Sequence, residues 1–283
     1  MLSKSGLEPI DYLIIGHLTN DLTHPEPRIG GTAAYAALTA HAFGLRVGIV
    51  TSWGKEHRSE LFDEIQIVNH ETNQSTTFEN MDTDDGRELI LHHKAPDLDY
   101  YHIPQLWRSS PLVHIAPVAQ EVNPGIVRYF GENQVYMTPQ GFMREWNQAG
   151  HIKHTDWPEA AYILQQVEAA VISVEDVENN DVYIETLAQA LPILLVTDGE
   201  NGSDLYTQGE TTHIPASPMT AVDTTGAGDI FAATLFIQYD TKKNALEAAQ
   251  FAAQIAGISV SREGLNGIPT QDDLYDIQLP EVN

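Results

Sequence analysis

The stretch Asp223-Thr224-Thr225-Gly226-Ala227-Gly228-Asp229-Ile230-Phe231 decides the fold of this chain, because two glycines and an acidic residue open an apolar run. Apolar positions recur at helical spacing as far as Ile237, with no Pro or Gly before Tyr239, so we expect a helix that begins at or near Gly226. The N–H groups at a helix start have no partner within the helix, and glycines let a bulky anion approach them closely. Phosphate is therefore the ligand that this stretch predicts.

Asp229 lies in the first turn of the predicted helix, so its carboxylate is expected beside the anion rather than under it. A carboxylate in that position could accept a proton from an attacking hydroxyl. The alternative is that Asp229 only complements the helix dipole, which is worth about 0.3–1 kcal/mol. In that case Gly226 and Gly228 would only form a turn, and spacing alone leaves both interpretations open.

The string Asp-Thr-Thr-Gly-Ala-Gly-Asp at residues 223–229 closely resembles the C-terminal signature of the ribokinase/PfkB carbohydrate kinase family. In that family the Gly-Ala-Gly backbone forms an anion hole for the transferred phosphoryl group, and the second Asp is the catalytic base. The resemblance implies an anion hole at Gly226, Ala227 and Gly228 and a general base at Asp229. It also implies ATP-dependent phosphorylation of a hydroxyl on a small sugar or polyol.

Composition narrows the class of protein. The 283 residues include 40 acidic and 14 basic ones, and the net charge of −26 argues against nucleic acid or a phospholipid surface as a partner. Cysteine is absent, which excludes disulfides, thiolate metal sites and a Cys nucleophile. No apolar run is long enough to span a membrane, and the N-terminus does not read as a signal peptide, so we expect a soluble, cytoplasmic protein.

The N-terminal residues form a predicted βαβ unit. Residues 12–16 read as a buried strand ending in Gly, residues 32–43 as an Ala-rich helix, and residues 47–51 as a second strand.

Four residues in this unit carry a further resemblance to the kinase family, in which an Asp after the first strand and a Gly-Gly pair face the sugar. Here these are Gly16, Asp21, Gly30 and Gly31, and Tyr35 stands where the family often has Asn. The resemblance implies that Asp21, Gly30, Gly31 and Tyr35 bind substrate, although Tyr35 weakens a ribose assignment. The alternative is that Asp21 and the glycines are ordinary turn residues.

Residues 65–101 contain alternating runs joined by polar turns, which indicate half-exposed antiparallel strands outside the parallel core, beginning with residues 65–68. The resemblance implies a lid, drawn from about residues 16–30 and 64–104, that closes over the sugar and pairs with another subunit in a homodimer. Arg87 is a candidate phosphate contact from this lid, or else a solvated surface residue.

Strands alternate with helical segments again from residue 111 onward, beginning at residues 112–117. With the resemblance, this rhythm implies one α/β domain over residues 1–283. Its expected fold is a ribokinase-like three-layer α/β/α sandwich with a mostly parallel central sheet and a small antiparallel β lid. Residues 139–146, together with residues 30–35, look like the myo-inositol kinase-like branch, in which Arg144 either contacts substrate or pairs with an acidic neighbour.

Metal handling is implied by the family's Asn-x-x-Glu segment, which orders Mg²⁺ through water. This chain has Ser173 and Asp176 in that register, so Asp176 or the neighbouring Glu175 is expected to act there. The resemblance also implies that Asp223 and the loop near Gly264 hold a monovalent cation, K⁺.

A nucleotide site is implied by a second glycine turn, in which Thr197, Gly199 and Gly202 resemble the family's Thr-x-Gly-x-x-Gly segment; Thr225 is assigned to the same site. A plain strand-and-turn interpretation is equally natural. No Walker-type loop occurs, and Gly226 lies too far from the first βαβ unit for a dinucleotide fingerprint. The remaining alternatives are a nucleoside kinase and a non-catalytic nucleotide-binding protein on the kinase fold.

Overall fold

The structure is a computed structural model that describes residues 6–22, 26–54, 56, 59–83, 86–131 and 133–278. The side chain of Arg87, the candidate phosphate contact, lies outside this description.

A nine-stranded central sheet forms the middle of the molecule, in the order β15-β14-β13-β12-β9-β8-β1-β4-β5. All neighbours from β13 to β5 run parallel, and β14 and β15 are added antiparallel at one edge. The strands are β1 (Tyr12–Ile15), β4 (Val47–Thr51), β5 (Gln66–Asn69), β8 (Leu112–Ile115), β9 (Gln134–Met137), β12 (Ala169–Ser173), β13 (Ile193–Thr197), β14 (Ser203–Thr207) and β15 (Glu210–Ile214).

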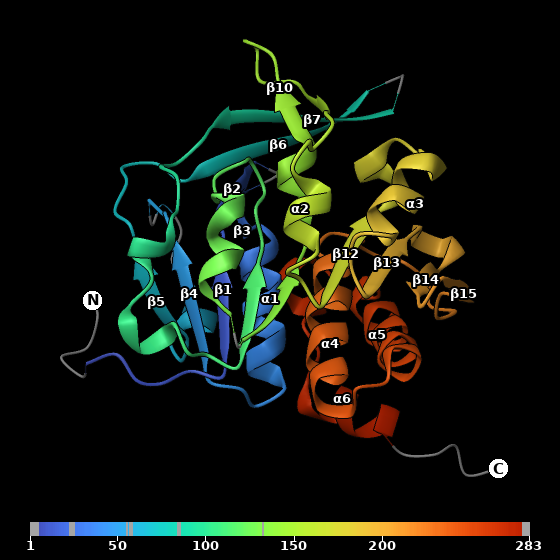
Figure 1. The fold of residues 1–283 in the computed structure, drawn as a ribbon. Helices are drawn as coiled ribbons and strands as arrows, with labels where there is room; N and C mark the ends of the chain where they lie inside the picture. Colours follow the sequence, from blue (N-terminus) through green and yellow to red (C-terminus); the bar gives the residue numbers. More distant parts are fainter. Residues whose placement is uncertain are drawn as a thin grey trace.

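Two helical layers cover the faces of this sheet, because successive strand residues point to opposite sides. Tyr12 and Ile14 of β1 belong to one apolar cluster, and Leu13 and Ile15 to the other. The first layer contains α1 (Thr32–Ala42), α4 (Ala227–Lys242), α5 (Ala245–Val260) and α6 (Gln271–Gln278), and the second contains α2 (Ala160–Leu164) and α3 (Asp181–Ala188) (Figure 1). The predicted three-layer α/β/α sandwich is confirmed.

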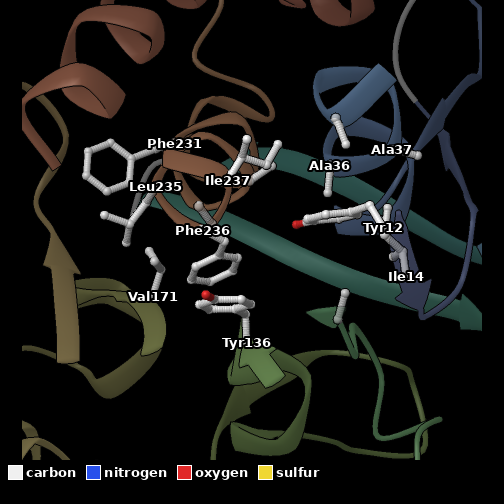
Figure 2. Packing of buried hydrophobic residues seen from close by; sticks show 14 of the residues in the cluster. Tyr12, Ile14, Ala36, Ala37, Tyr136, Val171, Phe231, Leu235, Phe236 and Ile237 are labelled. Carbon is white, nitrogen blue, oxygen red and sulfur yellow. The ribbon is translucent and has the colours of Figure 1, made fainter. Parts of the chain in front are cut away.

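Helix α4 packs its apolar side onto the middle of the sheet, as its sequence pattern predicts. The ring of Phe236 stacks on Tyr136 of β9 with 4.8 Å between the ring centroids, beside Val171 of β12 (Figure 2). Phe231 and Leu235 lie on the same side of the helix (Figure 2). The helix start is therefore held firmly against the strands that end near it.

Short 3₁₀ segments complete the chain. The segment η6 follows β12, and α3 begins only at Asp181, because Glu178 and Asn179 adopt positive φ angles of 50° and 56°. These segments are η1 (Glu60–Phe62), η2 (Tyr100–His102), η3 (Gln105–Trp107), η4 (Pro124–Tyr129), η5 (Pro139–Met143), η6 (Val174–Val177), η7 (Gly199–Asn201) and η8 (Gly264–Gly267).

A separate four-stranded sheet, the lid, crosses one end of the central sheet (Figure 1). Its order is β3-β2-β6-β7, in which β2 and β6 run parallel and the other two pairs antiparallel. A hairpin of β10 and β11 lies beside it, and Leu91 N–H of β7 donates to the Gly150 carbonyl at 2.8 Å. The strands are β2 (Thr19–Leu22), β3 (Arg28–Gly30), β6 (Thr76–Thr83), β7 (Gly86–His93), β10 (Arg144–Trp146) and β11 (Ile152–His154).

The placement of residues 65–68 outside the parallel core is wrong. Strand β5 pairs in parallel with β4, with Ile49 opposite Ile67, and so belongs to the central sheet. All four of its residues are half-buried because β5 is the edge strand. An edge strand shows the same partial exposure as a lid strand, so the pattern alone did not separate them.

Within the part of the chain that the structure describes, none of the helices has the length and apolar character needed to cross a bilayer.

Candidate active site

The start of α4 offers backbone donors to an anion. Gly226 is its N-cap residue, with a left-handed φ of 76°. Ala227 N–H donates to the Thr224 carbonyl at 3.2 Å, while among the described residues the N–H groups of Gly228 and Asp229 donate no backbone hydrogen bond. These two amides lie at the positive end of the helix dipole, whereas the Ala227 amide of the predicted anion hole is already paired.

The ring of Tyr35, on α1, lies directly under this glycine turn. A Cβ atom at Gly226 would lie 2.3 Å from Tyr35 ring carbons, and the positive φ further restricts the position to glycine. Tyr35 is almost fully buried, so most of its surface packs against other residues and little of it is left to contact a substrate. Substrate binding by Tyr35 stays a prediction.

Asp229 is the electrostatic centre of the site. Its Oδ1 accepts a hydrogen bond of 2.8 Å from the hydroxyl of Thr32. Burial raises the pKa of Asp229 to about 6; the Thr32 hydrogen bond and the positive charge of Arg144 oppose the rise, and the charges of Asp176 and Asp21 add to it. A carboxylate with this pKa is ionised at neutral pH and is a stronger base than an ordinary aspartate.

Three of the predicted substrate residues, Asp21, Gly30 and Gly31, lie together near Asp229. The Asp21 carboxylate covers Gly30, where a Cβ atom would lie 2.0 Å from its Oδ2, and its Oδ1 accepts a 2.7 Å hydrogen bond from Thr19. Gly31 is the N-cap of α1, with a φ of 83°, and Thr32 follows it. The double glycine therefore brings the lid residue Asp21 to the start of α1, beside the start of α4.

Asp176 is the residue of the predicted metal pair that faces Asp229. Its Oδ2 accepts the Ser173 N–H at 2.9 Å, and burial raises its pKa while the charge of Arg144 lowers it. Glu175 is exposed, and its backbone N–H donates a hydrogen bond to the Ser173 hydroxyl. Asp176, Asp21 and Asp229 concentrate negative charge near the helix start, which fits a divalent cation such as Mg²⁺.

A direct metal cluster is not found: in the described ranges no group of three or more His, Asp or Glu side chains could hold an ion.

Asp223 is the predicted monovalent-cation residue, and both of its carboxylate oxygens already accept hydrogen bonds from the backbone. Its Oδ1 accepts Thr225 N–H and its Oδ2 accepts Gly264 N–H, each at 2.9 Å. Burial opposes these hydrogen bonds, but the pKa of Asp223 stays below its usual value. Arg28 of the lid places Nη1 4.0 Å from Asp223 Oδ2 and donates from Nη2 to Glu263 at 2.5 Å. A guanidinium supplies the positive charge here, so these residues do not fit K⁺ well.

The predicted nucleotide residues lie at the carboxyl end of β13. Thr197 is opposite Ser173 in the sheet register, which places it next to the Asp176 turn. Gly199 and Gly202 have positive φ angles in the following turn, and no described contact joins either to Asp229. Thr225 is exposed, one residue before Gly226.

Gln140 has no role in the sequence prediction, and Arg144 has only the two alternatives given for it there. Gln140 Nε2 donates to the Thr32 hydroxyl at 2.8 Å, and Arg144 Nη2 donates to Gln140 Oε1 at 2.7 Å. Arg144 thus bonds to an amide rather than to the acidic neighbour that was one alternative for it. The available signals were that Thr32 follows the double glycine and that Gln140 and Arg144 belong to residues 139–146.

The three-layer sandwich, the lid across the strand ends and a carboxylate at a glycine-opened helix start define a protein of the ribokinase-like class. The model of the pfkB family carbohydrate kinases matches residues 158–271. Probable fructokinase-5 of Arabidopsis thaliana is 30% identical over 203 residues, which cover 66% of this chain and 59% of that protein. Over these residues the chain is similar to the pfkB family carbohydrate kinases, and it spans less than two thirds of the length of that relative.

Solved structures agree with this assignment at the level of the fold. A pyrophosphate-dependent kinase in the ribokinase family, complexed with a pyrophosphate analog and myo-inositol, has a TM-score of 0.79 at 20% identity, covering 93% of this chain and 99% of that one. Arabidopsis thaliana ribokinase, complexed with ribose and ATP, has a TM-score of 0.72 at 17% identity, covering 95% and 99%.

Proposed function

We propose that this protein transfers the γ-phosphoryl group of ATP to a hydroxyl group of a small sugar or polyol. The observation that carries the proposal is the Asp229 carboxylate, which has a pKa near 6 and lies in the first turn of a helix whose Gly228 and Asp229 amides are unpaired. A base and an anion-binding helix start in one place are what phosphoryl transfer to an alcohol requires.

Each residue has a defined part in this mechanism. Asp229 accepts the proton of the acceptor hydroxyl, whose oxygen attacks the γ-phosphorus in line. The unpaired Gly228 and Asp229 amides, in the turn that Gly226 opens, bind the oxygens of the transferring group, and Asp21 with Gly30 orients the acceptor. Asp176 would help to hold Mg²⁺, which would supply positive charge to the phosphates.

The acceptor class is inferred from chemistry and from the relatives. Asp21 offers acceptor oxygens that suit a polyhydroxy compound, and the similar proteins are a probable fructokinase and two kinases complexed with ribose or myo-inositol. A nucleoside kinase and a non-catalytic nucleotide-binding protein remain alternatives. Pyrophosphate is a second candidate donor, because the pyrophosphate-dependent kinase has the higher TM-score of the two structures described above.

An acceptor and donor panel tests this proposal. With Mg²⁺ present, we expect ADP formation with a hexose, pentose or inositol, and slower turnover with nucleosides. Phosphate release from pyrophosphate with the same acceptor, without ADP formation from ATP, would reassign the donor. ATP binding without turnover across the panel would favour the binding-protein alternative. Replacing K⁺ by choline is expected to leave the rate unchanged, because both carboxylate oxygens of Asp223 already accept backbone N–H groups and Arg28 lies 4.0 Å away.

The pH dependence of kcat/KM gives a second test. Asp229 must be ionised to act as a base, and burial raises its pKa to about 6. Activity is therefore expected to fall as the pH drops through about 6, rather than through about 4 as for an ordinary aspartate. A rate profile that stays flat down to pH 5 would contradict Asp229 as the base.

Pairing of two copies through the lid is proposed only on the family resemblance. In this chain the Leu91 N–H of β7 already donates to the Gly150 carbonyl, between β10 and β11. The other edge strand of the lid, β3, is therefore the edge left for such pairing.

A further inference from the structure

A chain of three hydrogen bonds leads from the lid side of the molecule to the proposed base. Arg144 donates to Gln140, Gln140 donates to Thr32, and Thr32 donates to Asp229, at 2.7, 2.8 and 2.8 Å. We call the set Thr32, Gln140 and Arg144 the relay.

The direction of this chain is fixed by the chemistry at its two ends. A guanidinium has only donors, so the amide oxygen of Gln140 must face Arg144 and its NH₂ group must face Thr32. A hydroxyl has one proton, and since Thr32 accepts from Gln140, that proton is directed to Asp229. The relay therefore always presents a donor to Asp229 and favours the ionised, correctly oriented carboxylate.

Arg144 is anchored at the junction of the lid and the main body. Its Nη1 donates to the Val118 carbonyl at 3.0 Å, after strand β8. Its guanidinium carbon lies 5.9 Å from the ring centroid of Phe78, a buried residue of lid strand β6. A cation over an aromatic face at this distance is attracted by the ring.

We propose that Arg144 is a positioning residue that holds the Asp229 carboxylate in its reactive orientation through Gln140 and Thr32. This inference rests on the proposed function, because it assigns the relay to the base of that reaction. Thr32 is fully buried and lies one residue after the double glycine, so the same turn that receives Asp21 also delivers the donor to Asp229.

The groups that face Asp229 set the sign of the expected pH effect. Arg144 and Thr32 lower its pKa, whereas Asp176 and Asp21 raise it, and the phenol of Tyr35 is close enough to interact with it. Removing the Thr32 donor removes a lowering influence, so the pKa of Asp229 must rise.

The first experiment compares Thr32→Val with Thr32→Ser, using the acceptor and donor that give activity in the panel. Thr32→Val is expected to lower kcat about tenfold, the loss of a hydrogen bond to a charged group, and to move the acid limb of the rate profile to higher pH. KM for the acceptor should change little. Thr32→Ser keeps the hydroxyl and should restore both kcat and the limb. An unchanged Thr32→Val enzyme, or a Thr32→Ser enzyme as impaired as Thr32→Val, would overturn the proposal.

The second experiment tests whether Arg144 acts through Thr32. Arg144→Met is expected to lower kcat about tenfold in the natural chain but less than about twofold in the Thr32→Val background, because coupled residues are not additive. Fully multiplicative losses would instead mean that Arg144 touches substrate directly. Asp229→Asn is measured in parallel. If Asp229→Asn is active, the proposed function is wrong. If Asp229→Asn is inactive but Thr32→Val has normal activity, only the role of the relay is wrong.

Discussion

Asp229→Asn is expected to lower kcat by roughly 10²–10⁴-fold, the usual contribution of a general base. The amide keeps the shape of the side chain and can still contact the Thr32 hydroxyl, but it cannot take the proton of the acceptor. Binding of ATP should remain largely intact, because the helix-start amides are unchanged. Steady-state ADP formation and equilibrium nucleotide binding, measured on the same preparation, separate the two effects.

Asp240→Asn is the matched control, since Asp240 lies on the same helix at the opposite end and pairs with Lys243. This variant removes the same charge and should retain turnover. Full activity in Asp229→Asn would exclude Asp229 as the base, and equal losses in both variants would point to a general charge effect.

Gly226→Ala is expected to lower kcat at least about 100-fold and to destabilise the fold by about 1–3 kcal/mol, the cost of a strained left-handed residue. The added methyl group would also meet the buried ring of Tyr35 at 2.3 Å. Either the ring or the start of α4 must move, and a donor displaced by 1 Å loses much of its effect on a transferring charge. Thermal unfolding and kcat should be measured together.

Gly228→Ala is the control for stability, because nothing lies within 4 Å of its added Cβ atom and its φ is not in the left-handed region. We expect its melting temperature to match that of the natural chain. A Gly226→Ala protein as stable and as active as the natural one would show that the turn tolerates another conformation.

The sequence predicted the central elements closely, because their patterns are local. The apolar spacing after Gly226 predicted α4, and the short apolar runs predicted β1 and β4 nearly to the residue. Strand β5 was placed outside the core because its partner depends on the whole sheet, and half-burial reads the same at an edge as in a lid.

The site was predictable only where a motif marked it. Asp21, the double glycine and Asp229 were brought together as the family resemblance implied, although no physical pattern links residues so far apart. The relay was missed because Thr32 and Asp229 are 197 residues apart and Gln140 lies 108 residues from Thr32. Thr and Gln at these positions carry no signal until the backbone brings their polar atoms within hydrogen-bond distance.

The ion pair between Arg28 and Glu263 joins lid strand β3 to the loop that follows α5. Its side chains are 40% and 61% exposed, so it contributes about 0–1 kcal/mol and is screened by salt. Thermal motion can break so weak an ion pair, and a higher ionic strength weakens it further without changing the contacts of Asp229. The link between lid strand β3 and the loop after α5 is thus expected to loosen in saline surroundings, whereas the part-buried hydrogen bond from Thr32 to Asp229 is screened much less.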